Sequence, residues 1–184
     1  MTPPMRTALA TAFLALAACG ADLQIDRACA ASAGFSTPPL PPGPATTVPV
    51  PPVRLSFAFG DAVPDRSKSG VHDVSVLARS FDLTSSQSTD FVTSLTVAVV
   101  PPAGSGLAQK TIGTYQRPPG GSGKSLSVAA DGTDLFPYLE AGRLTLEVSG
   151  EADPLRLPAT PSTVGAAACA EVKGSVDYFK AAGL

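Results

Sequence analysis

His72 is the only histidine in the chain, and Asp73 follows it directly. A Ser-His-Asp catalytic arrangement would have to use this pair, with a serine brought close by the fold. The sequence has no Gly-x-Ser-x-Gly turn to hold such a serine, and no serine stands three residues before a lysine. A single histidine at the start of a strand is typical of a surface position. We therefore expect no catalytic residue here.

The carboxylates suggest two other kinds of chemistry. The run Asp-Gly-Thr-Asp at 131–134 could offer two oxygens to Ca²⁺, but a calcium site needs six or more. Capping of a short helix by Asp131 or Thr133 is the simpler role. Elsewhere, Asp61 and Asp65 precede His72 and Asp73 around a predicted loop. Paired-carboxylate hydrolysis of a glycan stays open, because the separation of such groups depends on the fold.

A glycine-rich run, Gly-Gly-Ser-Gly-Lys-Ser at 120–125, is close to a nucleotide-binding loop. In the pattern Gly-x-x-x-x-Gly-Lys-Ser, that loop needs a glycine five residues before Gly123, and this position is Pro118. The residues after the run alternate like a strand, whereas the motif needs the start of a helix. The sequence therefore predicts a hairpin loop and no nucleotide.

The N-terminus carries an export signal. Arg6 precedes an apolar run, Ala8–Ala15, which is too short to span a bilayer as a helix. It leads into Leu16-Ala17-Ala18-Cys19, which resembles the lipobox of bacterial lipoproteins. The alternatives are an ordinary secretion signal and an uncleaved anchor. The resemblance covers about twenty residues of the chain.

The resemblance implies that residues 1–18 form a signal peptide, cleaved before Cys19. It also implies diacylglycerol on the Cys19 sulfur and an acyl chain such as palmitate on its new amine. Gly20 in place of aspartate favours the outer membrane. We thus expect a lipid-anchored protein of the cell envelope, with residues 19–36 as its lipidated N-terminal segment.

The two remaining cysteines are Cys29 and Cys169. If Cys19 carries lipid, an oxidising exported compartment favours a disulfide between these two. The alternatives are buried free thiols or metal ligands. Two cysteines and one histidine make a poor zinc set, because a structural site wants four ligands. We expect the disulfide, no metal and no cofactor.

Composition restricts the partners. Without the signal, 166 residues remain, with 12 basic and 15 acidic side chains. This mild acidity argues against nucleic acid. The chain has 19 Pro and 17 Gly, so helices should be few. Half of the residues in 37–52 are proline, which predicts a polyproline spacer from the membrane or a crossover docked on the fold.

Beyond residue 52 the apolar residues recur with a period of two. This pattern predicts half-buried strands, with an eighth at Leu23–Cys29 and a bulge between Val76 and Leu77. One short helix is expected within Asp134–Ala141. The seven strands after the proline run are expected at Val53–Phe59, Val74–Leu83, Phe91–Val99, Lys110–Gln116, Lys124–Ala129, Leu144–Val148 and Val172–Tyr178.

These strands predict an all-β fold, an antiparallel β-sandwich of Ig-like architecture with about seven or eight strands. A small β-barrel is the alternative. The domain would cover 53–184, joined by 23–29. We expect a non-catalytic binding or structural module anchored in the envelope, with an envelope protein or glycan as its partner. The alternative function is an envelope hydrolase that uses carboxylates or His72.

Overall fold

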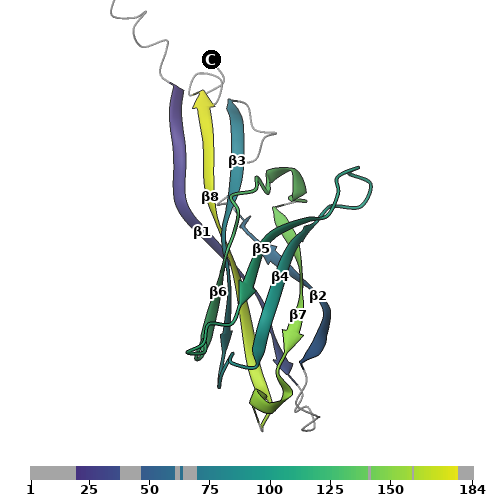
Figure 1. Ribbon diagram of the computed structural model, residues 1–184. Helices are drawn as coiled ribbons and strands as arrows, with labels where there is room; N and C mark the ends of the chain where they lie inside the picture. Colours follow the sequence, from purple (N-terminus) through teal and green to yellow (C-terminus); the bar gives the residue numbers. More distant parts are fainter. Residues whose placement is uncertain are drawn as a thin grey trace, which may run out of the picture.

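Two four-stranded antiparallel sheets pack face to face in the computed structural model (Figure 1). The structure describes residues 20–37, 47–60, 63, 70–140, 142–158 and 160–177. Sheet A has the strand order β1-β8-β3-β6, and sheet B has the order β2-β7-β4-β5. The strands are β1 (Gly20–Thr37), β2 (Val48–Ala58), β3 (Val71–Ser85), β4 (Val92–Val100), β5 (Lys110–Gln116), β6 (Ser125–Ala129), β7 (Arg143–Ala152) and β8 (Ser162–Asp177).

The predicted β-sandwich is confirmed, and the described strands do not close into a barrel. The eighth strand expected at Leu23–Cys29 is the middle of the longer β1. β8 also starts well before the predicted Val172. Its first half carries alanines at the buried positions 166, 168 and 170. Alanine has a weak strand preference, which is why the apolar pattern missed this half.

The core lies between the two sheets and is built from alternate residues of each strand. Phe57 of β2 and Phe81 of β3 are almost completely buried and meet edge to face, with ring centroids 6.1 Å apart. This geometry is favoured by the quadrupoles of the two rings. Leu144 and Leu146 of β7 are equally buried. The pair of phenylalanines thus joins sheet B to sheet A.

The predicted bulge in β3 exists, but it is not between Val76 and Leu77. Val76 and Ala78 both point into the core, and the inward phase then shifts to Phe81. The register with β8 changes between Ala78 and Ser80, and a second shift lies between His72 and Ser75. A residue inserted at each place restores apolar side chains to the core face. Leu77 is only half-buried, which misled the prediction.

The end of the proline-rich run is strand β2 at the edge of sheet B. Pro49, Pro51 and Pro52 lie in this strand, and its register with β7 shifts between Val50 and Val53. Proline lacks an N–H for the sheet, so strands tolerate it at edges and bulges. These prolines also hinder pairing of another chain with this edge. The run connects β1 to β2, two strands of one domain, and residues 38–46 lie outside the described residues.

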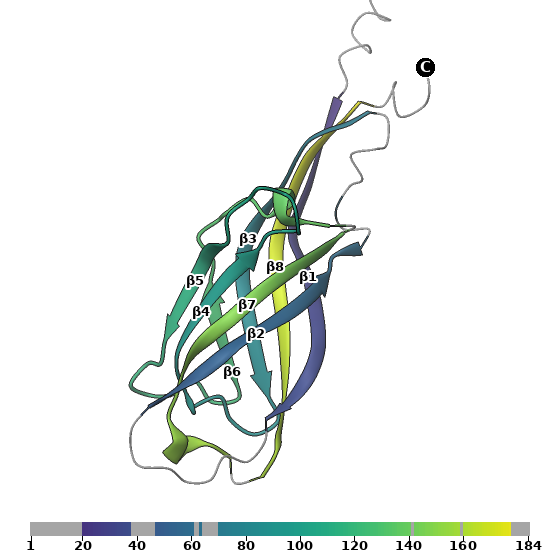
Figure 2. The ribbon, with the colours of Figure 1, turned by 90° about the vertical axis from the view of Figure 1, so that its right-hand side faces the viewer.

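Sheet A is longer than sheet B at one end. Figures 1 and 2 show β1, β8 and β3 continuing together past the body of the sandwich. Gly20 of β1 pairs with Asp177, and Val71 of β3 pairs with Val176. We call this three-stranded extension (residues 20–25, 71–76 and 172–177) the projection. It contains the start of β1. Within the described residues, no helix is long and apolar enough to cross a membrane.

The predicted helix at Asp134–Ala141 is reduced to one 3₁₀ turn, η2 (Phe136–Tyr138). Neither Asp131 nor Thr133 caps it, contrary to our expectation. The carboxylate of Asp134 accepts the N–H of Phe136 at 3.0 Å and the N–H of Val76 at 2.9 Å. This carboxylate therefore fastens the turn to β3, a contact far apart in sequence.

Candidate functional site

His72 and Asp73 lie side by side in solvent on the projection. The His72 Nε2 atom is 3.8 Å from the Asp73 carboxylate, and the two side chains are 53% and 80% exposed. The other ring nitrogen lies 3.3 Å from the Gly70 carbonyl. Among the described residues, no serine hydroxyl contacts this ring. Asp61 and Asp65, the other acids of this predicted group, lie outside the described residues.

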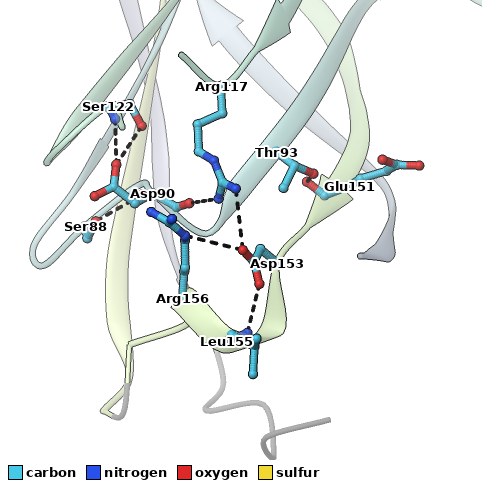
Figure 3. Close-up of polar contacts among 9 residues, drawn as sticks. All are labelled: Ser88, Asp90, Thr93, Arg117, Ser122, Glu151, Asp153, Leu155 and Arg156. Atoms are coloured by element: carbon cyan, nitrogen blue, oxygen red, sulfur yellow. Dashed lines mark hydrogen bonds and ion pairs between the residues drawn. The ribbon is translucent and has the colours of Figure 1, made fainter. Parts of the chain in front are cut away.

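The glycine-rich run 120–125 holds a carboxylate from the chain itself (Figure 3). The N–H groups of Ser122 and Gly123 donate to Asp90 Oδ1 at 2.5 and 3.0 Å. These two backbone hydrogen bonds lower the pKa of Asp90 below its ordinary value. Gly121 has φ +79°, and a Cβ there would come within 2.7 Å of the same oxygen. The backbone N–H groups with which this loop could bind an anion are thus used to bind the Asp90 carboxylate.

The prediction that this run forms a hairpin loop is wrong. It follows β5 in sheet B and precedes β6 in sheet A, so the loop crosses between the sheets. The two strands do touch at Gly113 and Ala130. A Cβ at Gly113 would lie 2.8 Å from the Ala129 carbonyl. Only glycine therefore allows the two sheets to approach so closely on this side.

A second polar cluster ties together the loops at the end of the sandwich away from the projection (Figures 1 and 3). Arg117 donates to the Asp90 carbonyl at 2.5 Å and lies 3.5 Å from the Asp153 carboxylate. Arg156 pairs with the same carboxylate at 3.4 Å. Asp153 also accepts the N–H of Leu155 at 3.1 Å and so caps the 3₁₀ turn η3 (Pro154–Arg156). These charges hold loops in place.

The disulfide lies on the outer face of sheet A. Cys29 and Cys169 sit directly opposite one another on β1 and β8, and their sulfurs are bonded. Arg27 lies beside it and contacts both Cys29 Sγ at 3.4 Å and the Asp82 carboxylate at 3.9 Å. Nearby, Glu171 is buried beneath Arg79 and Lys173 and forms an ion pair with each. The predicted bond is present in the structure.

The acids considered for calcium are engaged within the chain. Asp131 accepts the N–H of Thr133 at 2.9 Å and lies 3.9 Å from Lys110. Its pKa is lowered chiefly by the Thr133 hydroxyl. Asp134, as described above, holds η2. In the described part of the chain, no three His, Cys, Asp or Glu residues gather as a metal-ligating group.

An open groove of about 800 Å³ on the outer face of sheet B is a different kind of site. Its floor is formed by neighbouring strands, because Thr145 of β7 pairs with Ser56 on one side and with Val100 on the other. We call it the arginine groove, after the arginines at its rim. It is lined by Arg54, Ser56, Val100, Pro101, Pro102, Ala103, Tyr138, Glu140, Arg143 and Thr145.

The loop between β4 and β5 forms one wall of this groove. The Tyr138 hydroxyl donates to the Ala108 carbonyl at 3.1 Å, which ties this loop to η2. Gln109, the next residue, donates to Glu147 at 2.8 Å, which ties the same end of the loop to β7. Pro101 and Pro102 stiffen its beginning, because proline fixes φ. The wall is therefore held by two hydrogen bonds at the end that leads into β5 and stiffened by prolines at its beginning.

The two arginines of the groove differ in their surroundings. Arg54 pairs with Glu147 at 3.0 Å, and the Gln109 and Arg54 contacts lower the pKa of Glu147. Arg143 and Glu140 bond to each other through their backbones at 2.9 Å in both directions. Their exposed side chains make no ion pair or hydrogen bond within the described residues. Among the described residues, the groove thus offers a guanidinium and a carboxylate that have no side-chain partner.

Sequence reasoning did not single out this groove. Arg54, Ser56, Arg143 and Thr145 were simply the polar members of two alternating strands. Their sequence positions differ by about 90 residues, and only the β2–β7 register joins them. The sequence offered one signal for the groove: two predicted strands each carry an arginine followed two positions later by a hydroxyl residue.

Comparison with known proteins assigns no family to this chain. No family model matches the chain, and no curated protein matches it. Among solved structures, it is similar to one described as the structure of tomato aspermy virus. That match has 14% identity and a TM-score of 0.24, and it covers 70% of this chain and 75% of the other.

Proposed function

We propose that this protein is a lipid-anchored, non-catalytic binding module of the bacterial cell envelope, located at the outer membrane. The lipobox-like run ending at Cys19 supports the anchor, and Gly20 in place of aspartate supports the outer membrane. The arginine groove carries the binding role, because it is roomy and open and because two of its charged side chains, Arg143 and Glu140, have no ion-pair partner among the described residues. Grooves of a few hundred Å³ with a few polar groups are common binding sites.

The position of β1 shows where a lipid at Cys19 would lie relative to the fold. Cys19, itself outside the described residues, directly precedes Gly20, the first residue of β1. A lipid there would adjoin the tip of the projection rather than a long tether. The part of β1 in the projection, residues 20–25, is about 20 Å long at ~3.3 Å per residue. The projection would then hold the sandwich, and its groove, away from the lipid surface.

The anchor is tested by labelling cells with a radioactive or clickable fatty acid. Cys19→Ala should abolish labelling and leave unprocessed precursor, whereas Cys29→Ala should still be labelled. If Cys19→Ala is cleaved and remains in the membrane fraction like the wild type, the anchor proposal is wrong.

The binding role is tested by photo-crosslinking in cells. A photoreactive amino acid replaces Ser56 in the groove, and the control places it at Thr163, an exposed residue of β8. We expect a discrete adduct from Ser56 and none from Thr163. Equal adducts from both positions, or none from Ser56, would contradict a groove that binds a partner.

A further inference from the structure

We propose that a cavity between the two sheets binds a hydrocarbon group, carried by a molecule whose polar part stays outside. The cavity has a volume of about 110 Å³. Nine described residues line it, and all of them are Val, Leu or Phe. None of these residues lines the arginine groove, so the inference is independent of the role proposed for that groove.

The wall of the cavity determines the chemistry of its ligand, because it exposes only apolar atoms. Water needs several polar partners in a buried site, so an apolar cavity stays dry. A hydroxyl or charged group would lose its hydrogen bonds to water on entry and gain none. An engineered apolar cavity of ~150 Å³ takes up benzene. The group that enters here is therefore a hydrocarbon of up to about six carbon atoms.

Two β-bulges shape the cavity. β2 shifts its register on β7 between Val50 and Val53, and β4 shifts its register on β7 between Val92 and Ser94. A bulge bends its strand, so both neighbours of β7 bend at this level. Val50 and Val53 both line the cavity, although regular alternation would turn residues three positions apart to opposite faces. The backbone of sheet B therefore forms this space.

The entrance lies at β2, the edge strand of sheet B. Val53 lines the cavity and is also 39% exposed, so its side chain borders both the cavity and the solvent. Pro51 and Pro52 form the bulge beside it and have no N–H with which another strand could pair. The polar part of the ligand would remain in water at this edge.

The lipid proposed at Cys19 is too far away to be the occupant. Val164, which lines the cavity, pairs with Phe35 of β1, fifteen residues beyond Gly20. At ~3.3 Å per residue, this is about 50 Å along the strand. One acyl chain spans about half of the ~30 Å hydrocarbon core of a bilayer. The ligand is therefore a separate molecule.

The test uses the protein as isolated from cells, in lipid nanodiscs, with the methyl groups of Val148 and Val164 observed by NMR. The probes are 1-hexanol and 1,6-hexanediol, and the free concentration of each is measured from its own signals, because both also enter lipid. Hexanol can leave its hydroxyl at the entrance, whereas the diol must bury a hydroxyl without a partner. We expect saturable shifts with hexanol and at least about tenfold weaker binding of the diol.

Val164→Phe would fill the cavity and should abolish the hexanol-induced shifts at Val148. Val100→Phe is the matched control, because it adds the same side chain to the outer face of sheet B, outside the cavity, and should leave hexanol binding unchanged. Thermal unfolding shows whether both variants are folded. If Val164→Phe does not fold, Val148→Leu adds a single methylene to the same cavity and should weaken hexanol binding.

Three outcomes would each overturn the proposal: no saturable binding of hexanol, equal affinity for hexanol and the diol, or unchanged hexanol binding in a folded cavity-filled variant. None of them bears on the arginine groove, which the crosslink from Ser56 tests separately.

Discussion

The disulfide gives the sharpest quantitative prediction, made with the double variant Cys29→Ser/Cys169→Ser. The two cysteines are 140 residues apart in the sequence. In the chain-entropy model, a crosslink closing a loop of this length destabilises the unfolded chain by about 5 kcal/mol. Typical domains have ~5–15 kcal/mol of stability, so the bond would supply a large share of it.

The native state should survive the loss of the bond. Cys29 and Cys169 are directly opposite, and on either side Ala28 pairs with Ala170 and Ala30 pairs with Ala168. These neighbours keep β1 on β8 without the crosslink. A serine at 169 would bury a hydroxyl, since Cys169 is 4% exposed, but the Asp82 carboxylate lies 3.8 Å from the sulfur and can accept its hydrogen. Most of the effect is therefore expected in the unfolded state.

The assay is urea unfolding of the mature protein followed by circular dichroism. The double variant should keep its β spectrum and unfold with a free energy lower by about 3–5 kcal/mol. The matched control is Ala31→Ser/Ala167→Ser, the next pair on the same face of the same two strands, which adds two hydroxyls and removes no bond. An unchanged free energy of unfolding in the cysteine variant, or an equal loss in the alanine control, would refute the loop-closure argument.

Three further predictions concern the core, acid sensitivity and the histidine. Phe57→Ala should cost about 3–5 kcal/mol in thermal or chemical unfolding, because it leaves a cavity beside Phe81; a loss below ~1 kcal/mol would show that this contact is not central. The lowered pKa of Asp90 means that its stabilising effect is present above about pH 3.8 and is lost as pH falls through the folded-state value. Asp90→Asn should thus reduce the fall in melting temperature between pH 5 and pH 2. A variant whose melting temperature falls as steeply as that of the wild type would contradict this. His72→Gln/Asp73→Asn should leave melting temperature and envelope phenotype unchanged, since both side chains are largely exposed; a folded variant without the phenotype would favour the hydrolase.

Local patterns predicted much of the fold. The strand predicted at Lys110–Gln116 from its flanking Gly- and Pro-rich turns is β5 with its observed bounds. The alternation in Leu144–Val148 likewise predicted part of β7, because burial on one face of a sheet imposes a period of two. The same logic failed where small residues line the core, as in the first half of β8. It also misplaced the β3 bulge, because Leu77 is apolar but lies on the half-buried outer face. Side-chain type alone does not say which face a residue occupies.

The roles of some single residues could also be predicted from the sequence. The number of cysteines favoured the Cys29–Cys169 bond, and Pro118 excluded a nucleotide loop. The occupant of that loop was not readable, because Asp90 is more than thirty residues away from Ser122. The role of Asp134 was not readable either, because its carboxylate joins the N–H of Phe136 in η2 to the N–H of Val76 in β3, far away in the sequence.

The sequence by itself determined that this chain forms strands and that two of its cysteines can be joined. These properties follow from local periodicity and from composition, which act between neighbours or through simple counting. The arginine groove was decided only by tertiary structure. Arg54 and Arg143 line the same groove because the register of β2 on β7 places Arg54 opposite Glu147 and Arg143 opposite Ala58, and that register depends on the burial of Phe57 and Leu144 between two sheets.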